Sequence, residues 1–152
     1  MSTPLAMLKK IKAIKIQELI LTVLESNTEI ITKYTQQQWK SGERSDGTPI
    51  GQYRNKSYAY YKANKSSLVD IGFNPKKPDF GFMDLIDTGE TVKSMVTTVS
   101  GDSLKQVLKS DRFDLLKRFS DELLGLTKES RVDLILRYLY PQLIELVKEK
   151  LS

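Results

Sequence analysis

The stretch VKSMVTTVSGDSLKQVLK, from Val92 to Lys109, decides the fold class of this 152-residue chain. Two runs in which apolar and polar residues alternate, 93–99 and 104–109, flank the turn-forming sequence Ser100-Gly101-Asp102-Ser103. Alternation of period two is typical of strands with one buried face, and a Gly-Asp pair between two such runs favours a tight turn. The stretch therefore predicts a β-hairpin. Because an isolated two-stranded hairpin is marginally stable, it needs a helix beneath it or a neighbour's strand at its edge.

The sequence of the N-terminal part predicts one long helix, from residue 4 to about Trp39. Ser2 or Thr3 can cap this helix, and Pro4 suits its first turn, where a missing N–H costs nothing. Apolar residues recur at three- and four-residue steps and form one stripe that we expect to pack in the core. The stripe consists of Ile16, Leu19, Ile20, Val23, Ile30, Ile31 and Tyr34. Binding of the Lys-rich first turns to a membrane surface is the alternative interpretation.

Two helices are predicted after the hairpin. Residues 111–124 return to a helical period, and Gly125 is a candidate for their C-cap. Thr127 can cap a last helix, whose apolar face contains Val132, Ile135, Leu136, Leu139, Leu143, Ile144, Val147 and Leu151. Pro141 lies inside that pattern and should kink the helix or restart it near Tyr140.

A turn-rich arm, residues 40–91, separates the predicted long helix from the hairpin. Its glycines and prolines predict little regular structure, except for one short helix over 57–65 that Asn55 or Ser57 could cap. A segment this long without regular structure is usually functional or disordered. Its aromatic and aliphatic residues argue against full disorder. We therefore expect an arm that orders on contact with another molecule.

Composition excludes several classes of chemistry. The chain has no cysteine and no histidine, which excludes disulfides, thiolate metal sites and Ser-His or Cys-His nucleophile pairs. Residues 1–80 hold 13 Lys and Arg against 7 Asp and Glu, a net +6, whereas residues 81–152 hold 11 against 12, a net −1. The first half is therefore the part of the chain that we expect to bind an acidic surface or nucleic acid. We expect no membrane segment and no signal sequence.

The sequence Asp87-Thr88-Gly89 raises the question of an aspartic protease. Such a protease needs two carboxylates that share one proton inside an all-β body, so a single Asp-Thr-Gly could serve only in a homodimer. Glu90 follows the glycine and would crowd the pair of carboxylates, and the flanking sequence is mostly helical. We therefore interpret Asp87, Thr88 and Gly89 as a structural turn, with Gly89 at positive φ. No catalytic, metal-binding or cofactor-binding residue is predicted.

A basic and aromatic segment within the arm is the candidate interaction site. It contains Tyr53, Arg54, Lys56, Tyr58 and Tyr61. Tyrosine and arginine are favoured at protein interfaces. The same segment, 40–77, could bind nucleic acid, with lysines on phosphates and tyrosines stacked on bases. It could also be a solvated surface loop whose tyrosines fold inward. No signature of a known nucleic-acid-binding domain accompanies it.

Three segments together resemble a known group of proteins. They are GERSDGTPIGQYRNKSYAYYK (42–62), LIDTGETVKSM (85–95) and LLGLTKESRVDLILRYLYPQL (123–143). In this order they resemble the small neck, tail-completion and minor-tail structural proteins of tailed bacteriophages and prophages. That group has a long first helix, a turn-rich loop, a Leu-x-Asp-Thr-Gly junction into a β-hairpin, and helices after it. The polar Glu90-Thr91 stands where the group more often has an aromatic residue or leucine.

The resemblance implies a non-enzymatic virion protein, made in the host cytoplasm, that assembles as a ring in the head–tail connector, neck or tail-completion layer. It implies as partners further copies of the chain and the portal, neck or tail proteins; DNA passing through the ring is a further candidate partner. The expected architecture is a single α+β domain over residues 1–152. A small nucleic-acid-binding accessory protein is the alternative function.

Overall fold

The computed structural model describes residues 3–67, 83, 90–101, 103–109 and 123–152. These residues combine helices with an antiparallel two-stranded sheet, which confirms the predicted α+β class. The helices are α1 (Pro4–Ala13), α2 (Ile16–Ser26), α3 (Thr28–Lys40), α4 (Lys56–Ser67), α5 (Glu90–Lys93), α7 (Lys128–Leu134) and α8 (Tyr140–Leu151), with a π-helical turn, η1 (Ile135–Leu139), between the last two. The strands are β1 (Met95–Ser100) and β2 (Ser103–Leu108).

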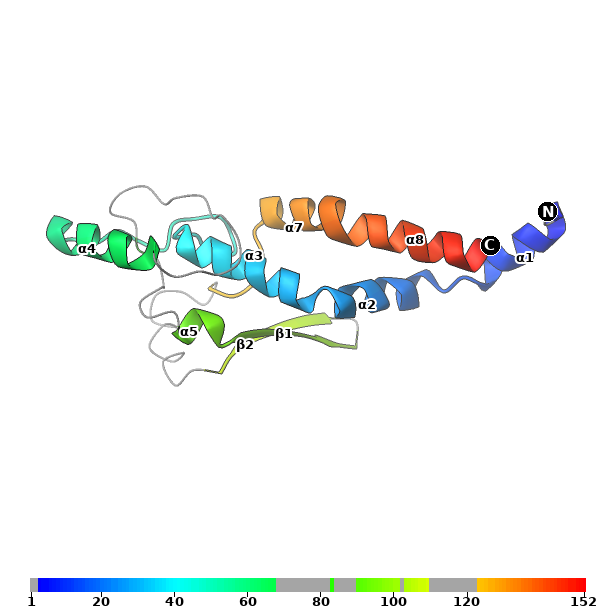
Figure 1. The fold of residues 1–152 in the computed structure, drawn as a ribbon, viewed down its shortest axis with the longest axis horizontal. Helices are drawn as coiled ribbons and strands as arrows, with labels where there is room; N and C mark the ends of the chain where they lie inside the picture. Colours follow the sequence, from blue (N-terminus) through cyan, green and yellow to red (C-terminus); the bar gives the residue numbers. More distant parts are fainter. Residues whose placement is uncertain (1–2, 68–82, 84–89, 102, 110–122) are drawn as a thin grey trace.

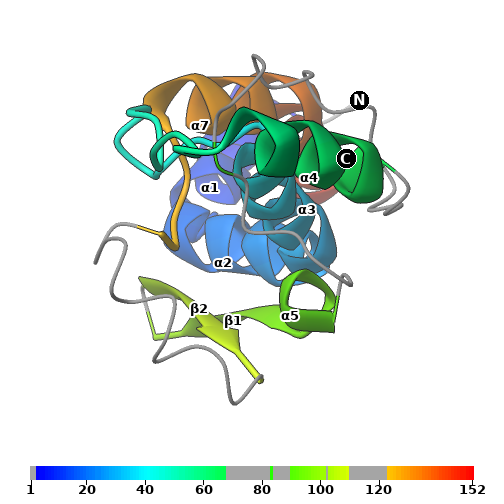
Figure 2. The ribbon, with the colours of Figure 1, turned by 90° about the vertical axis from the view of Figure 1, so that its left-hand side faces the viewer.

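The molecule is elongated and built in three layers (Figures 1 and 2). α2 and α3 form the middle layer, with the hairpin on one side and the α7–η1–α8 segment on the other. α4 lies at one end of the long axis, and α1 lies at the other, beside the C-terminus (Figure 1).

The predicted long N-terminal helix is divided into three. Thr3 Oγ1 accepts a hydrogen bond from the Ala6 N–H at 3.2 Å, which confirms the predicted cap. Extended backbone at Ile14 separates α1 from α2. Asn27 separates α2 from α3, because its buried side-chain amide donates to the Val23 carbonyl at 2.6 Å and also pairs with Gln142. A side chain that bonds to nearby backbone competes with the helix, which explains the break.

The hairpin agrees with its prediction to within two residues. β1 and β2 pair in a register that sets Met95 opposite Leu108 and Ser100 opposite Ser103, so Gly101 begins a two-residue turn. Gly101 has φ +60°. The tight turns that match the twist of a β-hairpin need a positive φ at their first residue, and glycine adopts it readily. Met95 and Thr97 are buried against the middle layer.

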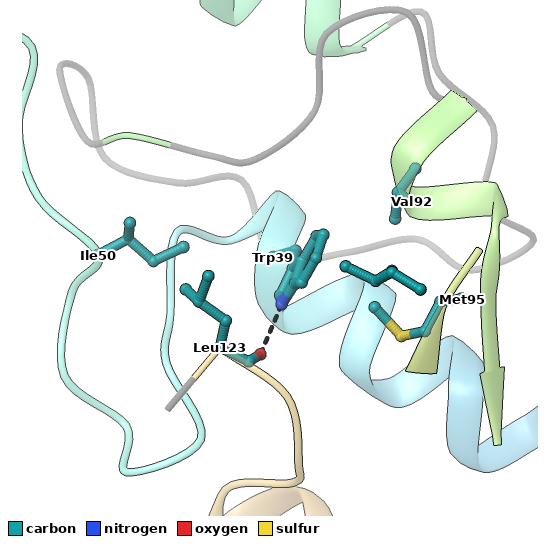
Figure 3. Packing of buried hydrophobic residues seen from close by; sticks show 6 residues of the cluster. Trp39, Ile50, Val92, Met95 and Leu123 are labelled. Atoms are coloured by element: carbon teal, nitrogen blue, oxygen red, sulfur yellow. Dashed lines mark hydrogen bonds between the residues drawn. The ribbon is translucent and has the colours of Figure 1, made fainter. Parts of the chain in front are cut away.

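The core beneath the hairpin centres on Trp39, which is fully buried in the last turn of α3 (Figure 3). Ile50, Val92, Met95 and Leu123 surround it, together with Leu108. Because Ile50 belongs to this cluster, the first part of the predicted arm is packed on the body of the molecule. Five other parts of the chain therefore converge on the end of α3: the loop that follows it, α5, β1, β2 and the segment before α7.

In the C-terminal segment the α-helix α8 begins at Tyr140, as the position of Pro141 predicts. The Tyr140 N–H donates to the Ile135 carbonyl, five residues back, and this π-helical turn leads into α8 with Pro141 in its first turn. Thr127 caps α7 through a 3.1 Å bond from the Ser130 N–H, which confirms that prediction. The wider turn shifts the helical register, so Leu134 and Leu139, five residues apart, both pack against the body.

Two parts of the predicted apolar stripes are wrong. Ile16 and Ile20 are exposed, because the core contacts of the middle layer begin only near Val23. Val132, Ile135 and Leu136 are also exposed, and Leu136 retains 65% of its accessible surface. The prediction assumed one continuous α-helical period, and the π-helical turn breaks that period.

Candidate interaction surface

The predicted interface residues lie at and just before α4. Asn55 caps this helix, because its side-chain oxygen accepts from the Tyr58 N–H at 3.1 Å and its carbonyl accepts from the Ala59 N–H at 3.0 Å. The predicted helix over 57–65 and its Asn55 cap are thereby confirmed. Ala59 and Lys62 are buried and hold one face of α4 against the molecule.

Three tyrosines of the candidate site form a ring cluster. Tyr53 and Tyr58 meet edge to face with ring centroids 5.2 Å apart, and Tyr58 and Tyr61 lie 6.3 Å apart. Tyr58 is 49% and Tyr61 58% exposed. Rings that stay half-exposed while they order one another lose little side-chain entropy when a partner covers them. This cluster has the character of a binding surface.

The charged members of the predicted site are exposed beside these rings. Arg54 and Lys56 are both exposed. They can therefore act as a basic rim around an aromatic centre, which is the usual organisation of a binding surface. Tyr60 is also exposed on α4.

The loop from α3 to α4 fixes where α4 begins. The Arg44 N–H donates to the Thr48 carbonyl at 2.8 Å, and the Ile50 N–H donates to the Gly42 carbonyl at 2.8 Å. Asp46 closes the turn by accepting from the Thr48 N–H at 2.9 Å. Ile50 is buried in the core, and this fixes the position of the backbone that leads to Tyr53 three residues later.

The other predicted site, Asp87, Thr88 and Gly89, lies outside the described residues. Its interpretation as a structural turn therefore stays a prediction. Within the described part of the chain, no group of three or more Asp and Glu side chains is placed to hold a metal ion. No helix among the described residues is long and apolar enough to cross a membrane.

A perturbed ionisable group lies away from this cluster, between α3 and α7. The Tyr34 hydroxyl donates to Asp133 Oδ2 at 2.5 Å, and Asp133 Oδ1 lies 3.3 Å from the Arg137 guanidinium. Burial of the ring raises the pKa of Tyr34, and the hydrogen bond to the Asp133 carboxylate raises it further. A tyrosine held neutral in this way is a structural donor. Nothing in this contact supplies a nucleophile.

A hollow of about 800 Å³ lies between β2 and the C-terminal helices. Its walls are mainly leucine and isoleucine, including Leu24, Ile31 and Leu126, with Asp46 and Arg131 among the charged residues beside them. Such walls suit apolar contact rather than acid–base chemistry.

Sequence reasoning missed a second set of exposed residues, on α1. Leu5, Leu8 and Ile11 are exposed on this helix, and none of its residues is buried. The run of four lysines in residues 9–15, without an acidic residue, was the signal that this helix is not part of the core.

No protein-family model matches this chain, and no curated protein or solved structure is significantly similar to it.

Proposed function

We propose that this chain is a structural subunit of a tailed-phage virion, assembled as a ring in the head–tail connector, neck or tail-completion layer. The observation that carries the proposal is the ordered and half-exposed tyrosine cluster of Tyr53, Tyr58 and Tyr61, which α4 presents at one end of an elongated body. Interface hot spots are enriched in tyrosine and arginine, which supports a protein partner. The resemblance of the three sequence segments gives the proposal its viral context.

The partner at this surface is a neighbouring connector, portal or tail protein with an acidic rim. Arg54 and Lys56 flank the rings and would steer an acidic surface toward them. Exposed charges of this kind act mainly on the association rate, so assembly should slow as salt rises. The rings supply the area that holds the complex together.

The test is incorporation of a variant with Tyr58→Ala and Tyr61→Ala into assemblies with the portal and neighbouring proteins of the same genome. We expect incorporation to be blocked, with the melting temperature almost unchanged because both rings are half-exposed in the free chain. Tyr140→Ala removes an exposed tyrosine from α8 and is the matched control. Normal incorporation of the double variant would contradict the role of α4.

The alternative function is nucleic-acid binding by the same surface, since exposed tyrosines beside basic residues can stack on unpaired bases. A salt titration against single-stranded DNA separates the two. Binding that falls steeply with salt and depends on Tyr58 and Tyr61 would favour the accessory-protein hypothesis.

A further inference from the structure

β2 is an edge strand, and some of its backbone groups point away from β1. The Lys109 N–H donates to the Ser94 carbonyl at 3.1 Å, so these two residues form a hydrogen-bonded pair of the antiparallel ladder. Hydrogen-bonded and non-hydrogen-bonded pairs alternate along such a ladder. In the observed register, the N–H and C=O groups of Leu104 and Gln106 therefore point outward. No backbone group among the described residues pairs with them.

The apolar hollow of about 800 Å³ lies along this edge. Leu104 and Gln106 line it from β2, and no described residue of β1 does. Side chains alternate between the two faces of a strand, so these two residues share the face that packs toward the middle layer. A strand added beside β2 would likewise point every second side chain into the hollow. The apolar walls that would receive these side chains include Leu24, Ile31, Leu126 and Ile135.

The Gln106 side chain holds this edge in place. Its Nε2 donates to Thr35 Oγ1 of α3 at 2.8 Å, and its Oε1 accepts from the Gly125 N–H, beside the hollow, at 2.8 Å. β2 is thereby fixed both to the middle layer and to the segment before α7. A strand edge that is already ordered loses little entropy on binding, which favours the addition of a further strand.

The opposite face of β2 is basic. Lys105 and Lys109 lie four residues apart on this face, and both are exposed. Within the described part of the chain, neither side chain forms an ion pair. Opposite charges that face each other across a strand pair stabilise it, and like charges destabilise it. A strand that pairs with β2 should therefore carry acidic residues opposite these lysines and apolar residues at the positions between.

These features select a strand of another protein rather than a second copy of this chain. The described strands, β1 and β2, contain no aspartate or glutamate, and β2 of a second copy would bring further lysines. We propose that an extended segment of another protein pairs antiparallel with β2 as a third strand. Its backbone would bond to Leu104 and Gln106, and its apolar side chains would enter the hollow. Its acidic side chains would meet Lys105 and Lys109.

The edge of β2 does not include the tyrosine cluster of α4, so this second site goes beyond the proposed function and can be tested without the portal protein. The probe is the blocked peptide TVEVTVEVT, whose valines share one face and whose two glutamates lie four residues apart on the other. It is titrated into the isotope-labelled full chain and followed by NMR. We expect the largest changes in amide chemical shift at Leu104 and Gln106. No binding at millimolar peptide, or the largest changes in α4, would overturn the proposal.

Methylation of the peptide backbone tests the strand pairing itself. In antiparallel pairing the valine N–H groups face β2, whereas the glutamate N–H groups face away. Methylation of the two valine nitrogens that flank the central threonine should therefore weaken binding about tenfold or more. Methylation of the two glutamate nitrogens is the matched control and should have a much smaller effect. Any other order of the two affinities would overturn the proposed pairing.

Charge reversal tests the basic face of β2. Lys105→Glu with Lys109→Glu should weaken binding of TVEVTVEVT several-fold, and the peptide TVKVTVKVT should restore binding to this variant. Lys9→Glu with Lys12→Glu reverses two exposed lysines of α1 and should have no effect. Equal affinity of the two peptides for the Lys105 and Lys109 variant would overturn the proposal.

The hollow is tested by a pair of neighbouring exposed residues on η1. Ile135→Asn changes the wall of the hollow and should weaken peptide binding, whereas Leu136→Asn changes a residue that does not line it and should leave binding unchanged. Equal effects of the two changes would overturn the proposal. Without peptide, chemical shifts of the Leu104 and Gln106 amides that vary with protein concentration would assign the edge to a second copy of the chain and would likewise overturn it.

Discussion

The Trp39 indole Nε1 donates a 2.7 Å hydrogen bond to the Leu123 carbonyl, which ties the end of α3 to the segment that leads into α7 (Figure 3). Both residues are almost fully buried. The indole thus does two things at once: its rings fill the core, and its N–H satisfies a carbonyl that water cannot reach.

Trp39→Phe should separate these two contributions. Phenylalanine keeps most of the apolar volume but leaves the Leu123 carbonyl without its partner, so we expect a loss of about 1–3 kcal/mol of unfolding free energy. Trp39→Ala should cost about 3–5 kcal/mol, since it also opens a cavity. Urea denaturation followed by circular dichroism measures both, because Trp39 is the chain's one tryptophan and fluorescence is lost with it. A Trp39→Phe variant as stable as wild type would show that the bond is not needed.

The buried hydroxyls of Thr32 and Thr97 should behave as a coupled pair. Their oxygens lie 2.7 Å apart between α3 and β1, and both side chains are buried. Thr32 also donates to the Thr28 carbonyl at 2.9 Å, and Thr97 also accepts from Gln106 at 3.1 Å, so each hydroxyl keeps one partner when the other is replaced. Thr32→Val or Thr97→Val alone should cost about 0.5–1.5 kcal/mol for the lost hydroxyl–hydroxyl bond, which the double change removes only once. In a double-mutant cycle the double variant should therefore lose clearly less unfolding free energy than the sum of the losses in the two single variants. Additive losses would mean that the two hydroxyls do not interact.

Gly125 should not tolerate a side chain. Its φ is +105°, and an added Cβ would lie 3.4 Å from the Ser45 Cβ. Gly125→Ala should lower the unfolding free energy by about 1–3 kcal/mol, because alanine is strained in this backbone conformation. Gly51→Ala is the control, since its added Cβ would meet only the flexible Met83 side chain. Similar losses in the two variants would show that crowding rather than φ limits these positions.

Stability should fall at alkaline pH through Tyr34. The pKa of Tyr34 is higher in the folded chain than its ordinary value of about 10, because the ring is buried and its hydroxyl donates to the Asp133 carboxylate. The stabilisation is fully present below that ordinary value and is lost as pH rises above it, at up to about 1.4 kcal/mol per pH unit. Denaturation between roughly pH 8 and 11 should show this decline in the wild type. Tyr34→Phe should flatten it, and an unchanged slope in the variant would assign the decline to other groups.

Local rules predicted the elements whose signals are local. The hairpin follows from its alternation and its Gly101 turn, and the caps at Thr3, Asn55 and Thr127 follow from short polar side chains before helical runs. Pro141 predicted where the last helix begins, because proline has no backbone N–H to donate to the preceding turn.

The other features depend on partners far along the chain. Asn27 breaks the N-terminal helix because Gln142, 115 residues later, completes its hydrogen bonds, and no window around Asn27 contains that information. The exposed positions Val132 and Leu136 follow from a π-helical turn, which hydrophobic periodicity does not reveal. Of the candidate site, the residue types of the tyrosine cluster could be read from the sequence, but the ring contacts depend on how Ile50 anchors the loop.

The polar side chains of α3 have a consequence for how the molecule unfolds. Gln36 donates to the Val92 carbonyl at 2.8 Å. Gln38 bridges to the backbone of Gly125 and Thr127. Thr35 accepts from Gln106 of β2 at 2.8 Å.

One helix therefore holds hydrogen-bond partners for the hairpin, for α5 and for the connection to α7. If any of these neighbours detaches, a buried donor or acceptor on α3 loses its hydrogen-bond partner. Amides in β1, β2 and α3 should consequently exchange with solvent through a single cooperative opening, as one foldon, whereas α1, with no buried residue, should exchange by local fraying.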